Sequence, residues 1–246
     1  WEGRTKGAPV TDWQGRPYDK ANGPAAHPNS RFTVSAKQNP AYNHLMEHPE
    51  GVPISAILFG GRRREVAPLV YEARDWAHGV MIGAGMASET TAAAVGQVGV
   101  VRRDSMAMKP FCGYNFADYW THWLSFEGKV KQLPKIFHVN WFRQDKDGKF
   151  LWPGFGDNLR VLSWVIDRCE GRAKAHETPI GLLPHKEDLD LRNVNLPESA
   201  LHQLLDVDVA AWHTEIDEIG KYLEEFGSRT PPALRAEYQR VKAALG

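Results

Sequence analysis

The chain has 246 residues, of which 30 are lysine or arginine and 30 are aspartate or glutamate, so its formal net charge is zero. This balance argues against a protein that binds nucleic acid through phosphate contacts. With 42% hydrophobic residues, no apolar run approaching the roughly 18 residues that span a bilayer and no signal segment at its start, we expect a soluble, cytoplasmic protein without membrane contact.

The two cysteines, Cys112 and Cys169, belong to no cluster with metal-ligand spacing. We therefore expect no disulfide framework and no metal site within this sequence. The chain begins with Trp1, and residues 3–28 show neither helical nor strand periodicity. This start is typical of a piece of a longer protein.

In chain order, three short β-rich runs come first, each bounded by turn residues. They predict strands over residues 52–61, 68–73 and 79–85. The run from 90 to 99 contains only small residues, valine and one glutamine. Because nothing in it is large enough to anchor it to a core, we expect a mobile surface loop there.

Aromatic residues at helical spacing predict an amphipathic helix between residues 114 and 131, and a strand over 135–142 follows. A charged turn over 143–149 leads into the irregular loop FLWPGFGDN and then into a helix from residue 159 to about 170. Two apolar stripes near the end predict two further helices that carry no chemistry. The expected fold class is mixed α/β (α+β), with an extended entry segment over 1–30, a mixed lobe over 31–198 and C-terminal helices over 199–246.

The loop FLWPGFGDN places Phe150 and Phe155 near Asn158. Two rings on a loop can clamp a flat base, since stacking of a base on an aromatic ring contributes roughly 1–3 kcal/mol whichever base it is. An asparagine amide at the edge of the base, with one acceptor and two donors, could then select guanine. The alternative is that these aromatic residues belong to the core.

Two arginine-containing clusters could bind anions. Arg62, Arg63 and Arg64 follow a glycine pair at the end of a predicted strand, where open sheets tend to bind anionic ligands. A solvated basic turn is the alternative. The string HPNSRF contains an arginine that could grip a carboxylate or could be an ordinary loop residue. The sequence contains no GxxxxGK[ST], GxGxxG or GxSxG motif, so spacing alone predicts no complete catalytic site.

Taken together, several strings between about residues 24 and 184 are similar to one known family. They are HPNSRF, EGVPISAILFGGRR, PLVYEA, SETTAAA, PFCGYNF, LPKIFHVNWFR and GKFLWPGFGDNLRVL. The sequence resembles the C-terminal lobe of GTP-dependent phosphoenolpyruvate carboxykinases, more weakly in its helical tail. The resemblance implies an enzyme of gluconeogenesis, a carboxy-lyase that converts oxaloacetate and GTP into phosphoenolpyruvate, carbon dioxide and GDP, with Mn²⁺ and Mg²⁺ held by ligands outside this chain.

The resemblance also implies roles for particular residues. Asn29, Ser30 and Arg31 would bind the substrate, and Arg31 would be the catalytic residue that approaches the transferring phosphoryl group. An active-site lid would include Thr90, Thr91, Ala92, Ala93 and Ala94. The nucleotide, GTP or GDP, would be bound by Arg31, Arg62, Phe142, Phe150, Phe155, Gly156, Asp157 and Asn158.

The family's phosphate-cradling loop and metal ligands lie upstream of anything in this sequence. Because phosphoryl transfer depends on positioning and on metal charge, we expect the chain to be inactive alone. Its partners would be oxaloacetate or phosphoenolpyruvate, GTP and the missing N-terminal lobe, and the intact enzyme would be a monomer. A non-catalytic guanine-nucleotide binding module is the alternative.

Overall fold

The computed structural model describes residues 5–27, 30, 33–91 and 97–246. The chain divides into two compact units, Trp1–Val52 with Thr90–Gly99, and Pro53–Glu89 with Val100–Gly246. The described residues of the first unit form three short 3-10 turns, η1 (Lys20–Asn22), η2 (Ala36–Gln38) and η3 (His44–Glu47), and an isolated β-bridge between Thr11 and Pro17. The segmentation predicted from the sequence, with borders after residues 30 and 198, stays a prediction.

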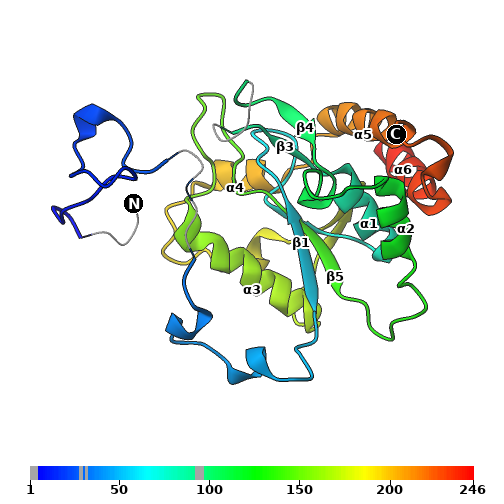
Figure 1. Ribbon diagram of the computed structural model, residues 1–246. Helices are drawn as coiled ribbons and strands as arrows, with labels where there is room; N and C mark the ends of the chain where they lie inside the picture. The colour runs from blue at the N-terminus through cyan, green and yellow to red at the C-terminus, as the bar shows by residue number, and fades with distance from the viewer. Residues whose placement is uncertain (1–4, 28–29, 31–32, 92–96) are drawn as a thin grey trace. The chain divides into compact units, whose positions relative to one another are not determined.

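The second unit contains a mixed five-stranded sheet (Figure 1). Its order is β1 (Ala56–Gly60), β5 (Lys135–Val139), β2 (Val70–Glu72), β7 (Gly181–Leu183) and β6 (His176–Thr178). Strands β1 and β5 run parallel, whereas β2 is antiparallel to β5 and to β7. A separate hairpin pairs β3 (Ala87–Glu89) with β4 (Val101–Arg103). The predicted mixed α/β class is confirmed.

Apolar side chains leave both faces of the sheet and form two cores. In β5, Ile136 joins one core and Phe137 the other, as the two-residue period of a strand requires. The first core is closed by α1 (Trp76–Gly85), α2 (Phe116–Leu124), α5 (Val209–Glu224) and α6 (Pro232–Leu245). The second is closed by α3 (Asn158–Cys169) and α4 (Glu198–Leu205). Figure 1 shows α5 and α6 together at the C-terminal end of the chain.

The strand predicted over residues 79–85 is wrong, because this segment is part of α1. Asp75 caps the helix by accepting a hydrogen bond from the His78 backbone N–H at 2.8 Å. Nine of its ten residues are buried, so the helix has no polar face to give a helical period. A short, wholly apolar run cannot be told from a buried strand by periodicity.

Most other predicted elements are confirmed with shorter bounds. The predicted helix over 114–131 contains α2, the predicted strand over 135–142 contains β5, and the predicted helix from 159 is α3. The loop before α3 includes one regular turn, η5 (Phe155–Asp157). Three further 3-10 turns, η4 (Ser105–Ala107), η6 (Lys186–Asp188) and η7 (Gly227–Arg229), connect the remaining elements. No helix in the described ranges is long and apolar enough to cross a membrane.

Candidate functional site

A hollow of about 330 Å³ opens where the parallel strands β1 and β5 end. The carboxyl ends of parallel strands are the usual ligand-binding edge of an open α/β sheet. The hollow is lined by Gly60, Gly61, Arg62, Ser88, Val139, Trp141 and Phe142. Two of these, Arg62 and Phe142, are residues that the sequence predicts to bind a nucleotide.

The glycine pair allows the backbone at the end of β1 to pass very close to its neighbours. A Cβ atom on Gly60 would lie 2.8 Å from the carbonyl oxygen of Val139. A Cβ atom on Gly61 would lie 2.3 Å from the carbonyl oxygen of Ala87, which is backbone and cannot turn aside. Only glycine therefore fits at position 61 without moving β3.

The Arg62 side chain lines the hollow and lies over the ring of Phe142. Its guanidinium carbon is 5.0 Å from the centroid of the Phe142 ring, a cation–π contact. Its backbone N–H donates to Ser88 Oγ at 3.1 Å, and its carbonyl accepts from the Glu89 N–H at 2.9 Å. Among the described residues no carboxylate forms an ion pair with Arg62, so its positive charge can meet an anion.

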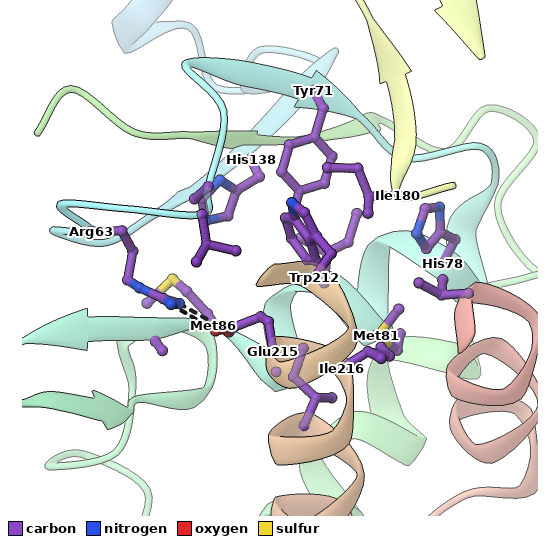
Figure 2. Close-up of a pocket in the computed structure, with 17 residues that line it drawn as sticks. Arg63, Tyr71, His78, Met81, Met86, His138, Ile180, Trp212, Glu215 and Ile216 are labelled. Atoms are coloured by element: carbon purple, nitrogen blue, oxygen red, sulfur yellow. Dashed lines mark hydrogen bonds and ion pairs between the residues drawn. The ribbon is translucent and has the colours of Figure 1, made fainter. Parts of the chain in front are cut away.

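The three adjacent arginines have three different environments. Arg63 is buried and turns into the protein, where it makes a bidentate ion pair with Glu215 at 2.9 and 2.6 Å (Figure 2). Arg64 pairs with Glu89 at 2.8 Å and is half-exposed. Arg63 is buried, so the interpretation of this cluster as a solvated basic turn is wrong for this residue. Its ion pair with Glu215 compensates the cost of burying the charge.

Glu215 is the centre of a buried charge cluster on α5. It also pairs with Arg103 at 2.6 Å, and Arg103 reaches Glu218 at 3.1 Å. Burial by itself would raise the pKa of Glu215, but the ion pairs with Arg63 and Arg103 lower it below its ordinary value. These ion pairs make Glu215 a buried, fully paired residue of α5, and the expectation that the C-terminal helices carry no chemistry stays a prediction.

The aromatic residues of the predicted base clamp have different burial. Phe142 and Phe150 meet edge to face with centroids 6.1 Å apart, and Phe150 is 53% exposed. Phe155, in η5, is 80% exposed. Trp152, which lies between Phe150 and Phe155 in the sequence, is fully buried in the second core. The alternative that Phe150 and Phe155 are core residues is wrong, because both side chains are exposed.

Asn158 begins α3, and its amide has a fixed orientation. The Trp152 indole N–H donates to Asn158 Oδ1 at 2.9 Å. Because an indole can only donate, it identifies the atom it faces as the amide oxygen. The NH₂ end is then the end of Asn158 that can meet a ligand. Nearby, Asp157 pairs with Arg160 at 2.8 Å, and a Cβ on Gly156 would meet nothing within 4 Å.

Comparison with known proteins gives one consistent family. The family model described as "Phosphoenolpyruvate carboxykinase C-terminal P-loop domain" matches residues 1–244. This chain belongs to the GTP-dependent phosphoenolpyruvate carboxykinase family. Proteins named phosphoenolpyruvate carboxykinase [GTP] are 52% identical in Chlamydia caviae over all of this chain and 49% identical in Anaeromyxobacter dehalogenans over 99% of it. The chain spans 42% of the length of each of these two curated relatives.

The predicted substrate-binding residues and the predicted lid residues lie in the first unit. Ser30 is exposed and donates its backbone N–H to the His27 carbonyl at 2.8 Å, whereas Asn29 and Arg31 lie outside the described residues. In the predicted lid, the Thr90 hydroxyl donates to the Gln97 carbonyl, and the Gly99 N–H donates to the Thr90 carbonyl at 2.9 Å. Thr91 is described without regular structure, and Ala92, Ala93 and Ala94 lie outside the described residues.

Sequence reasoning missed two residues that line the hollow, Ser88 and Trp141, and one buried residue behind it, Asn140. This residue directly follows β5, is fully buried and bonds to the backbone on both sides of the site. An asparagine between the strand KIFHV and two aromatic residues was the signal in the sequence. Ser88 and Trp141, which line the hollow, gave no comparable signal.

Two further hollows lie elsewhere in the second unit. One, of about 40 Å³, is enclosed beside the Arg63–Glu215 pair and is lined also by Tyr71, His138 and Trp212 (Figure 2). Burial lowers the pKa of His138 to about 4, so its imidazole is neutral there. The other, of about 320 Å³, lies between β6 and α4 and contains three histidines, His176, His185 and His202. Within the described ranges, no three His, Cys, Asp or Glu side chains are grouped so that they could hold a metal ion.

Proposed function

We propose that this chain forms the nucleotide-binding part of a GTP-dependent phosphoenolpyruvate carboxykinase, a carboxy-lyase of gluconeogenesis. Such an enzyme converts oxaloacetate and GTP into phosphoenolpyruvate, carbon dioxide and GDP. One observation carries the proposal, the Arg62 guanidinium laid over the Phe142 ring at the wall of the hollow between β1 and β5. The membership of the chain in this family supports the identity of the nucleotide.

In this proposal the base is recognised by aromatic residues and one amide. Phe142, Phe150 and Phe155 offer ring faces for stacking, and Phe150 and Phe155 are exposed enough to meet a ligand. Asn158 offers its NH₂ group, a donor that matches the O6 carbonyl of guanine and opposes the amino group of adenine at that position. Gly156 and Asp157 contribute backbone at the same turn.

The phosphate groups are proposed to be met by Arg62. A guanidinium fork suits phosphate oxygens, and no carboxylate among the described residues competes for it. Arg31 would assist from the HPNSRF string and would be the catalytic residue, with Asn29 and Ser30 binding oxaloacetate or phosphoenolpyruvate beside it. Residues 90–94 would form the lid. These four assignments rest on the sequence strings alone.

Divalent metal ions do not fit the described residues of this chain, because no suitable group of three ligands is present among them. We therefore derive no step through a metal, and we propose that Mn²⁺ and Mg²⁺ are held by the part of the carboxykinase that this chain does not span. The same part would supply the phosphate-cradling loop, since the sequence has no GxxxxGK[ST] motif. The chain alone would then lack turnover, and the full enzyme would be a cytoplasmic monomer.

The test is a titration of the chain with GDP and with ADP, followed by tryptophan fluorescence, because Trp141 lines the hollow. We expect tighter binding of GDP than of ADP. Replacing Phe142 by Leu removes both a ring face for stacking and the ring that Arg62 lies over, and should weaken GDP binding at least tenfold, since base stacking alone contributes roughly 1–3 kcal/mol. Phe126→Leu is the matched control, because Phe126 is a partly exposed ring that does not line the hollow. Equal loss in both variants, or no preference for GDP, would contradict the proposal.

A further inference from the structure

The backbone around the hollow is held by one buried side chain, that of Asn140. Its Nδ2 donates to the carbonyl oxygens of Arg63 at 2.9 Å and Ala67 at 3.0 Å. Its Oδ1 accepts from the Phe142 N–H at 3.1 Å and the Arg63 N–H at 3.4 Å. The side chain is 0% exposed, so these protein contacts are what satisfies its amide. Asn140 thus joins the segment after Arg62 to the segment that carries Phe142.

The segment that Asn140 holds contains a strained residue. Val66 has a φ of 67°, a left-handed conformation that is a rare outlier for a β-branched residue. The Ala67 N–H donates to the Glu65 carbonyl at 2.8 Å, which makes Val66 the centre of a three-residue γ-turn. Such a conformation persists only where the surroundings impose it. The two carbonyls bonded to Asn140 Nδ2, at residues 63 and 67, lie on either side of this turn.

We propose that Asn140 is a positioning residue that keeps the strained turn at Val66 closed and thereby holds Arg62 against the Phe142 ring. The proposal rests on the proposed nucleotide function of the hollow. Arg62 immediately precedes the held segment, and its ring partner Phe142 bonds to the same amide through its backbone. One side chain therefore fixes both halves of the wall before a ligand arrives.

The chemistry of the position requires an asparagine. The site has two carbonyl oxygens that need donors and N–H groups that need an acceptor, a set that a primary amide matches. Aspartate would offer no donor and would bury a charge, and leucine would leave every partner unsatisfied. Alanine leaves the turn without its two donated hydrogen bonds and lets Val66 relax to an ordinary φ.

The decisive experiment compares Asn140→Ala with the double variant Asn140→Ala/Val66→Gly in the 246-residue chain. Glycine adopts a positive φ without strain, so the turn can stay closed without its clamp. The same change removes an apolar side chain that packs against the first core, which lowers global stability. The double variant should therefore unfold more easily than Asn140→Ala while binding nucleotide more tightly. A purely structural role for Asn140 predicts the opposite order of affinities.

We expect Asn140→Ala to weaken GDP binding at least tenfold and Val66→Gly to restore at least threefold of that loss. Thr230→Val is the control, because Thr230 is a buried residue whose hydroxyl bond to the Leu223 carbonyl lies in the C-terminal helices. It should lower the melting temperature and leave GDP affinity within twofold. If Asn140→Ala does not fold, Asn140→Ser takes its place in both comparisons. GDP affinity within twofold of the wild type in the position-140 variant, or no recovery on Val66→Gly, would overturn the proposal.

Amide hydrogen exchange at Phe142 tests the positioning role of Asn140 independently of whether the hollow binds a nucleotide. Its N–H is protected by Asn140 Oδ1, so exchange should accelerate in the position-140 variant and not in Thr230→Val, with or without nucleotide. If the wild-type chain binds no nucleotide and this acceleration is seen, the proposed function fails and the positioning role stands. Unchanged exchange at Phe142 would overturn the positioning role.

Discussion

At the scale of single residues, the orientation of Asn158 gives the most specific expectation about ligand choice. Its oxygen is occupied by Trp152, so selection of a base would depend on the NH₂ group. In Asn158→Asp the carboxylate still accepts from the indole, and both donors are lost. We expect the ratio of GDP to ADP affinity to fall about tenfold, the effect of one hydrogen bond worth roughly 1.4 kcal/mol.

The measurement is a pair of titrations of the same Asn158→Asp preparation, one with each nucleotide. A new negative charge weakens both diphosphates, so the ratio isolates base recognition from charge repulsion. Phe155→Leu in the same loop should weaken both nucleotides and leave the ratio nearly unchanged, because stacking does not distinguish bases. An unchanged ratio in Asn158→Asp would mean that Asn158 does not read the base.

The arginines at 62–64 show which features of a single side chain could be predicted from the sequence and which could not. Their position after a glycine pair predicts an anion site, which stays a prediction, and a hollow lined by Arg62 opens there. Nothing local distinguished Arg63 from its neighbours, because its partner Glu215 lies 152 residues away. The same limit applies to Asn140, whose partners at residues 63 and 67 come from a different strand end.

At the scale of elements, α1 is the helix that periodicity mispredicts as a strand, and close packing of its glycines holds it in place. Its glycines allow it to pack tightly, since a Cβ on Gly79 would lie 2.4 Å from Cδ1 and 2.7 Å from Cβ of Ile136. Although alanine favours helix by about 1 kcal/mol, we expect Gly79→Ala to lower the free energy of unfolding by about 2 kcal/mol, the usual cost of overpacking a core.

Urea unfolding followed by circular dichroism checks this expectation for α1. Gly113→Ala is the control, because Gly113 has an ordinary φ and open space where a Cβ would stand. It should change stability by less than about 0.5 kcal/mol. A Gly79→Ala variant as stable as the wild type would show that β5 yields at Ile136, and that the helix is less closely packed than its geometry indicates.

The turn and loop over residues 143–158 were, in contrast, predicted, although the strand predicted before them ends at Val139 and not at residue 142. Proline, glycines and a charged turn with Gly148 at its tip are local signals, and Gly148 has the positive φ of a turn residue. The β-bridge between Gln144 and Phe150 that closes this turn was not predicted. Both α4 and the β6–β7 hairpin were missed because they are short and depend on packing against the second core. Local chemistry fixes turns, whereas short buried elements are decided by tertiary contacts.

At the scale of the whole second unit, two buried histidines make its stability depend on pH. Burial lowers the pKa of His138 to about 4 and that of His78 to about 3. Both have an ordinary value near 6.5 in the unfolded chain. As pH falls below 6.5, the unfolded state gains protons that the folded state does not, so the free energy of unfolding decreases. Between pH 7 and pH 5 each of the two histidines should lower the free energy of unfolding by about 2 kcal/mol.

Denaturant unfolding at pH 7, 6 and 5 measures this loss. His138→Phe keeps a ring against Tyr71 and removes the titrating group, so the loss between pH 7 and 5 should shrink by about 2 kcal/mol. The exposed His122, replaced by Asn, serves as the control. The Glu215 ion pairs do not disturb this window, because the lowered pKa of Glu215 places their loss at more acidic pH. A pH dependence unchanged in His138→Phe would show that His138 is not held neutral.

The close passage of Gly61 beneath Ala87 has a consequence for how this chain can vary over generations. Every amino acid reached from a glycine codon by a single-base change carries a Cβ atom. At position 61 that atom would stand 2.3 Å from a backbone oxygen of β3. No one-step mutation there can be absorbed by a side chain turning away, and a change would require β3 to shift at the same time. This end of β1 is thus closed to gradual drift, whereas a Cβ atom on Gly156, in the aromatic loop, would meet nothing within 4 Å.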